Sequence, residues 1–266
     1  MSAPPPRLWA SGDVYEPYVG RWSRLVAREL IAWLDRLPGG RWLDVGCGTG
    51  ALSQTVLDRA APASVNGIDA SSAFVGHAQA RVGDPRAAFQ VADAQALPFE
   101  DGRFDTAVSG LVLNFVPQPP RMVAEMRRVV RRGGTVALYV WDYGGEMQLM
   151  RHFWDAAAAL DPAAVLLDEA RRFPDCRPEP LAALFRDAGL DAVETRAIDV
   201  PTVFRDFDDY WTPFLGGGAP APAYCMALPE ERRAALREHL HGRLPARADG
   251  SIALVARAWA ARGVAP

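Results

Sequence analysis

The residues in this chain best suited to chemistry are three glycines that follow a short apolar run. Residues 42–45 predict a buried strand, and Gly46, Gly48 and Gly50 come directly after it, where a helical pattern begins. Glycine adopts backbone conformations that other residues avoid, and it lets a ligand approach the main chain closely. A strand, a glycine turn and a helix N-terminus in this order are typical of a nucleotide-binding corner.

An acid at the end of the next predicted strand extends this unit. A helix is expected over residues 51–60, ended by Pro62, and a strand over residues 65–69. Asp69 follows Gly50 by about 20 residues, as does the acid that binds a ribose in nucleotide-binding βαβ units. A carboxylate can accept hydrogen bonds from both ribose hydroxyls. A strand-end cap is the alternative for Asp69, and its place after the glycine turn favours the ribose.

A second acid follows a third predicted strand, over residues 89–91. Asp93 lies in the turn over residues 92–99, which reads ADAQALPF. An acid at such a place can equally serve as an Asx-type helix cap, so both roles stay open from the residues alone.

The alternation of strands and helices continues to residue 138. A fourth strand is expected over residues 104–109, and a fifth follows a turn within residues 130–138 that contains Gly133 and Gly134. The helix between them has apolar residues on one face, namely Met122, Met126, Val129 and Val130.

Four motifs in this order over residues 43–138 resemble those of the class I S-adenosylmethionine-dependent methyltransferases, in the UbiE-related or type 11 branch. The dinucleotide fingerprint needs its third glycine three positions after the second, whereas Gly50 follows Gly48 by two. Arg132 stands where the family usually has proline. The resemblance covers the chain well up to about residue 140. It implies an α/β fold with a Rossmann-like, doubly wound, seven-stranded sheet, mostly parallel with an antiparallel last strand, and helical lid insertions.

The resemblance implies S-adenosyl-L-methionine as the cofactor, with Asp69 at its ribose and Asp93 at its adenine amino group. The other positions assigned to the cofactor are Asp44, Gly46, Cys47, Gly48, Gly50, Ala70, Ala94, Ser109, Leu111, Tyr18 and Arg21. Tyr18 and Arg21 belong to an N-terminal segment that folds over the cofactor in this family. A helix is expected there, with one apolar face made of Val26, Leu30, Trp33, Leu34 and Leu37.

Substrate and catalytic residues are expected mainly after the fifth strand. The candidates for an acceptor pocket are Trp22, Asn114, Trp141, Tyr143 and Trp211. Ordinary core packing is an equal alternative for Trp22. Of four histidines, His152 is the first choice for a general base, since imidazole titrates near neutral pH. His77 is expected at the surface, and His239 and His241 on a cover.

One methyltransferase domain is expected over residues 1–266. Its parts are an N-terminal helical cap over residues 1–37, a cofactor-binding core over 38–142, and a C-terminal half over 143–266 with lid insertions at about 143–177 and 204–250. Residues 191–203 are expected to hold the sixth strand and its neighbour, and residues 251–260 the last strand. Helices are expected near residues 179–188 and 230–240.

Composition excludes several classes of protein. The chain is 50% hydrophobic without an apolar run of 18 residues, and its first residues lack a signal-peptide pattern, so a cytoplasmic protein without a membrane span is expected. Cys47, Cys176 and Cys225 are an odd number without paired spacing, which argues against disulfides and a metal site. The net charge of −3 argues against a nucleic-acid partner. All 29 basic residues are arginine, which excludes a lysine Schiff base.

These observations predict a methyltransferase that acts on an O, N or C atom of a small molecule, mainly by positioning the acceptor in line with the sulfonium methyl. Motifs for methylating nucleic-acid bases are absent after the fourth strand. Two alternatives remain: a dinucleotide-dependent oxidoreductase, which the glycine spacing disfavours, and a cofactor-binding protein of this fold that transfers no methyl group. The oligomeric state is not predicted.

Overall fold

The computed structural model describes residues 19–216 and 219–266. Its seven strands form one sheet in the order β3-β2-β1-β4-β5-β7-β6. The strands are β1 Arg41–Val45, β2 Ser64–Asp69, β3 Ala87–Val91, β4 Phe104–Gly110, β5 Val130–Trp141, β6 Asp191–Phe204 and β7 Ile252–Val264. Neighbours among β1 to β5 pair in parallel, and β7 runs antiparallel to β5. The predicted fold class is therefore confirmed.

The chain divides into two compact units, each with its own set of elements. The sheet unit comprises residues 23–142, 175–199 and 257–266. The helical unit comprises residues 19–22, 143–174, 200–216 and 219–256 among those described. The long strands β6 and β7 contribute residues to both units. The two predicted lid insertions, 143–177 and 204–250, fall mostly within the helical unit.

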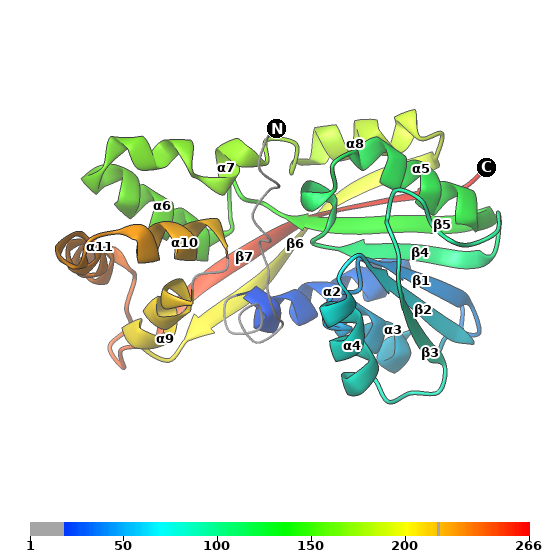
Figure 1. Cartoon of the computed structure of the whole chain (residues 1–266), viewed down its shortest axis with the longest axis horizontal. Helices are drawn as coiled ribbons and strands as arrows, with labels where there is room; N and C mark the ends of the chain where they lie inside the picture. Colours follow the sequence, from blue (N-terminus) through cyan, green and yellow to red (C-terminus); the bar gives the residue numbers. More distant parts are fainter. Residues whose placement is uncertain (1–18, 217–218) are drawn as a thin grey trace. The chain divides into compact units, whose positions relative to one another are not determined.

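Helices cover both faces of the parallel strands in the sheet unit (Figure 1). They are α2 Arg21–Leu34, α3 Ala51–Arg59, α4 Ser72–Arg81, α5 Pro119–Val129 and α8 Pro178–Asp187. Helices α3 and α4 pack on β2, and α5 packs on β4 and β5. Because both faces are covered, β1 is buried from Trp42 to Val45, and this buried stretch includes the polar residue Asp44. This arrangement leaves the carboxyl ends of β1, β2 and β4 to loops.

The helical unit is built around aromatic side chains. Its helices are α6 Gln148–Leu160, α7 Glu169–Arg172, α9 Phe207–Trp211, α10 Pro220–Ala227 and α11 Glu230–Arg243. The rings of Phe153 and Phe214 stack with centroids 4.4 Å apart. Tyr210 is fully buried, and its hydroxyl donates to the Leu149 carbonyl at 2.9 Å. The buried phenol thus keeps a hydrogen-bond partner, as burial of a polar group requires.

Most expected elements are present, and four details differ. Val130 is not on the helix face but begins β5, where it pairs with Phe104. Leu37 lies beyond α2 and is 86% exposed, because Asp35 adopts a left-handed conformation (φ 45°) that ends the helix. Residues 191–203 form one strand rather than two, since Pro201 is tolerated in β6 at the sheet edge. The last strand extends four residues beyond Ala260.

Candidate functional site

The turn after β1 has the backbone that its glycines predict. Gly46, Gly48 and Gly50 all have positive φ, at 75°, 51° and 82°. A Cβ added at Gly46 would lie 2.4 Å from a Val112 methyl, so this glycine serves packing. A Cβ at Gly48 would meet nothing within 4 Å. The open space at Gly48 is where a ligand can approach the main chain, so the turn fits the cofactor that the sequence predicts.

Asp69 ties this turn to the end of β2. Its Oδ2 accepts from the Gly48 N–H at 3.1 Å, and its Oδ1 accepts from the Ser71 N–H at 2.8 Å. Burial raises the pKa of the Asp69 carboxyl, and the two backbone donors oppose that shift. Each carboxylate oxygen has a second lone pair, so Asp69 can hold the turn and still accept from ribose hydroxyls. Ala70, the next residue, is exposed.

Asp44 is a buried carboxyl with one oxygen that lacks a partner. It is 1% exposed, and the Ser53 hydroxyl donates to its Oδ2 at 2.7 Å. Within the described residues, its Oδ1 has no hydrogen-bond partner. Burial raises the pKa of Asp44 to about 7. An orphaned buried oxygen is costly unless a donor supplies its hydrogen bond, so Asp44 is suited to a polar ligand group.

Cys47 lies in the same turn as an inert thiol. Its side chain is buried, and burial raises its pKa well above the ordinary range. A thiol that stays protonated is a poor nucleophile and a poor metal ligand, so the raised pKa fits Cys47 as a small side chain that fills the turn.

Asp93 and Ala94 lie in the turn after β3. Asp93 is exposed, and its Oδ1 accepts from the Gln95 N–H at 2.8 Å and from the Gln95 side-chain amide at 3.1 Å. These donors lower the pKa of Asp93. The Ala92 N–H donates to the Asp69 carbonyl at 3.0 Å, which ties this turn to the end of β2. Asp93 therefore forms an Asx-type turn, and its Oδ2 accepts a longer bond from the Gln95 side-chain amide, at 3.4 Å.

The loop after β4 carries Ser109, Leu111 and Asn114. The Ser109 hydroxyl donates to the Val45 carbonyl at 2.7 Å, and this bond joins the ends of β4 and β1. Leu111 has a φ of 63°, a left-handed conformation that is rare for leucine. Asn114 lies in a 3-10 turn, Leu113–Phe115. A non-glycine residue held in this conformation is a feature of functional sites as well as of tight turns.

Two candidates in the N-terminal segment, Arg21 and Trp22, are engaged in packing. Tyr18 lies outside the described residues. Arg21 donates to Asp209 at 3.1 Å, and its guanidinium lies 4.5 Å from the ring centroid of Trp22. Trp22 is buried, with its ring edge-on to Phe204 at 5.6 Å. The packing alternative for Trp22 thus describes its observed contacts.

The remaining candidates for the acceptor pocket and the general base belong partly to the sheet unit and partly to the helical unit. Trp141, in the sheet unit, is 2% exposed, and its Nε1 has no partner among the residues described. Tyr143 and Trp211, in the helical unit, are buried. His152 is half-buried in α6, and burial lowers its pKa. The Nε2 atom of His239, in α11, is buried and has no partner among the described residues.

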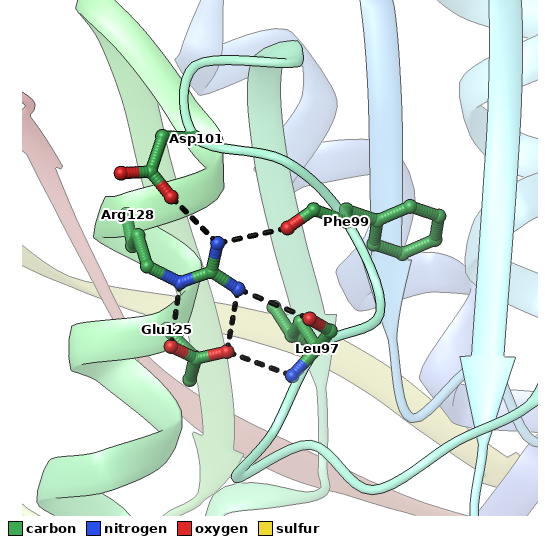
Figure 2. Close-up of polar contacts among 5 residues, drawn as sticks. All are labelled: Leu97, Phe99, Asp101, Glu125 and Arg128. Carbon is green, nitrogen blue, oxygen red and sulfur yellow. Dashed lines mark hydrogen bonds and ion pairs between the residues drawn. The ribbon is translucent and has the colours of Figure 1, made fainter.

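One group of residues at the candidate site was not predicted from the sequence. Glu125 and Arg128 of α5 form a polar cluster with the backbone of the turn that follows Asp93 (Figure 2). Their spacing of three residues on one helix is the only sequence signal for the pair.

A doubly wound sheet with a glycine turn and acids at the ends of successive strands defines a nucleotide-cofactor-binding α/β protein. A family model described as a methyltransferase domain matches residues 43–138. A phosphatidylethanolamine N-methyltransferase from Cereibacter sphaeroides is 36% identical over 50% of this chain and 64% of its own. A demethylmenaquinone methyltransferase from Roseiflexus castenholzii is 32% identical over 60% of this chain and 71% of its own.

The chain belongs to the class I S-adenosylmethionine-dependent methyltransferases, in the UbiE-related, type 11 branch. It spans 64% and 49% of the lengths of two of the relatives it matches. Among solved structures, the [4+2]-cyclase SpnF has a TM-score of 0.53 at 21% identity, covering 91% of this chain and 81% of its own. That likeness shows the fold alone.

No helix within residues 19–216 and 219–266 is both long and apolar enough to cross a membrane. In the same ranges, His, Cys, Asp and Glu side chains form no group of three that could hold a metal ion.

Proposed function

We propose that this chain transfers a methyl group from S-adenosyl-L-methionine to an O, N or C atom of a small molecule. The observation that carries this proposal is the open backbone at Gly48, held in place by the Asp69 carboxylate. Asp69 would thus both shape the turn and bind the ribose. These two roles together explain why an acid is needed at the end of β2.

The cofactor would be bound along the ends of three neighbouring strands. Asp69 would accept from the ribose hydroxyls, and Asp93 from the adenine amino group. The Asp44 oxygen that lacks a partner among the described residues would accept from the ammonium of the methionine part. Gly48 would let that part pass close to the main chain. When bound, the cofactor supplies an already activated methyl group on a sulfonium.

The chain's remaining task is to orient the acceptor and, for a protonated acceptor, to remove its proton. His152 would be the base, because its lowered pKa keeps the imidazole neutral and able to accept a proton at neutral pH. The aromatic candidates Trp141, Tyr143 and Trp211 would contribute apolar and cation-stabilising surface. Positioning would supply much of the acceleration, since the methyl donor needs no further activation.

We infer further that the chain is cytoplasmic and does not act on nucleic acid. Its three cysteines are free thiols, and its pI is near 5.8. Residues 143–177 and 204–250 remain our candidates for lid insertions that choose the acceptor.

A labelled-methyl screen tests the proposal. The full chain is incubated with cofactor labelled in its methyl group and with panels of small phenols, quinols, amines and carboxylic acids, and products are analysed by mass spectrometry. Transfer of label to one acceptor class is the expected result. Cofactor binding without label transfer to any acceptor would instead support a cofactor-binding protein that transfers no methyl group.

A further inference from the structure

We propose that Glu125 and Arg128 are positioning residues that fix the Asp93 turn and thereby set the selectivity of the site for adenine. This inference rests on the proposed role of Asp93 and extends it to two side chains on α5. Neither side chain needs to touch the cofactor to have this effect.

Arg128 holds the turn through its backbone carbonyls. Its Nη1 donates to the Phe99 carbonyl at 2.8 Å, and its Nη2 donates to the Leu97 carbonyl at 3.0 Å. Nη1 also donates to Asp101 Oδ1 at 2.7 Å. Figure 2 shows these acceptors arranged around one guanidinium. A planar group with several fixed donors fixes the geometry of its acceptors, which a lysine ammonium cannot reproduce.

Glu125 orients the guanidinium and adds a bond of its own to the turn. Its two oxygens accept from Arg128 Nε and Nη2, both at 2.7 Å. Its Oε2 also accepts from the Leu97 N–H at 2.7 Å. The hydrogen bonds from Arg128 lower the pKa of Glu125, so the carboxylate stays ionised. Leu97 is therefore held at both its N–H and its carbonyl by one ion pair.

A second connection from α5 reaches the Asp93 carboxylate through Gln95. The Gln118 N–H, at the start of α5, donates to the Gln95 side-chain oxygen at 3.0 Å. Gln95 in turn donates to Asp93 from its backbone and from its side chain. The turn is thus fixed to one helix on both sides of Ala96.

These contacts matter because Asp93 itself lies outside the helices and strands. The residue is exposed and lies in the loop between β3 and β4. The side chain of Leu97 is buried, and its backbone is bonded to Glu125 and Arg128 of α5, so Leu97 anchors that loop. A carboxylate fixed before the ligand arrives binds more tightly and more selectively, because less conformational freedom is lost on binding.

The test compares binding of S-adenosylhomocysteine with binding of S-inosylhomocysteine, which has an oxygen in place of the adenine amino group. Calorimetry is carried out on the full chain, on Arg128→Met, on Asp93→Ala and on the double variant. Arg257→Met is the matched control. Its guanidinium pairs with both oxygens of Asp199 at 2.7 and 2.8 Å, and it is 28% exposed against 32% for Arg128.

We expect Arg128→Met to lower the affinity for S-adenosylhomocysteine on the order of tenfold, within the usual range of coupling between residues in one network. Its preference for the adenosine ligand should fall toward that of Asp93→Ala. Adding Arg128→Met to Asp93→Ala should change affinity by less than about twofold, since coupled effects do not add. Arg257→Met should leave affinity and preference unchanged.

Each of the other outcomes of these titrations would overturn a particular step of the proposal. Reduced stability of Arg128→Met with an unchanged ligand preference would make the ion pair purely structural. If Asp93→Ala binds both ligands like the natural chain, the adenine assignment fails, and the positioning role fails with it. Failure of the natural chain to bind S-adenosylhomocysteine refutes the proposed function itself. Should Arg128→Met not fold, Arg128→Lys takes its place, with a smaller loss of preference expected.

Discussion

Replacing Asp69 by asparagine separates the two roles that the structure gives this carboxylate. The amide would keep the size of the side chain but present one acceptor oxygen in place of two. One of the backbone donors, at Gly48 or Ser71, would then lose its acceptor. Both hydrogen bonds are part-buried, and a hydrogen bond of this kind contributes about 0.5–1.5 kcal/mol, so the free energy of unfolding should fall by about that amount.

The same substitution removes the charged acceptor for the ribose. Loss of a hydrogen bond to a charged group costs about 1.5–3 kcal/mol, which corresponds to a loss of cofactor affinity of about 10- to 150-fold. Calorimetric titration with S-adenosylhomocysteine, at a temperature where the variant is fully folded, measures this loss. Denaturant unfolding measures the stability term separately.

Asp105→Asn is the control for this experiment. The Asp105 carboxylate also accepts from a backbone N–H, that of Arg41 at 2.7 Å, and it lies at the start of β4. Its replacement should lower stability and leave cofactor affinity unchanged. If Asp69→Asn loses stability but binds S-adenosylhomocysteine as tightly as the natural chain, the carboxylate serves the turn alone and the ribose assignment is refuted.

Three further predictions concern the same site. Gly48→Val should remove measurable cofactor binding in calorimetry, because its side chain enters the open space and a branched residue distorts a turn position with a φ of 51°, while circular dichroism shows a folded chain; a variant that binds normally would mean that no ligand approaches there. Asp44 is protonated more readily in the folded than in the unfolded chain, so its stabilising contribution is present near pH 4 and is lost as pH rises toward its pKa of about 7. Between pH 4 and 7, the free energy of unfolding of Asp44→Asn should therefore fall less steeply with pH than that of the natural chain, by about 1.4 kcal/mol per pH unit in denaturant titrations; equal slopes would contradict a raised pKa. His152→Gln should lower the methyl-transfer rate about 100-fold and abolish the acidic limb of the pH–rate profile, whereas an unchanged profile would exclude His152 as the base.

The first five strands could be predicted because local signals agree there. Glycines, prolines and acids mark the ends of apolar runs, and each of these signals acts over a few residues. The predicted element boundaries were wrong where contacts with a distant part of the chain determine the secondary structure. Val130 looks helical by spacing, yet its pairing with Phe104 makes it the first residue of β5. Residues 191–203 are expected to hold the sixth strand and its neighbour, yet the edge position of β6 accommodates Pro201 within one continuous strand.

The candidate site shows the same division. The conformations of Gly46 and Gly48 follow from residue type, and so does a carboxylate at the end of β2. The hydrogen bonds from Arg128 to Leu97 and Phe99 join residues about 30 positions apart, and no local sequence pattern predicts them. Partners of a long side chain depend on how α5 packs, which the sequence does not reveal.

The central claim is that the turn at Gly48 binds S-adenosyl-L-methionine, and calorimetry of the full chain tests it most directly. The cofactor and its demethylated product should bind with one-to-one stoichiometry, NAD should not bind, and Asp69→Asn should weaken both ligands alike. Tight binding of NAD, with neither S-adenosyl ligand bound, would contradict the account.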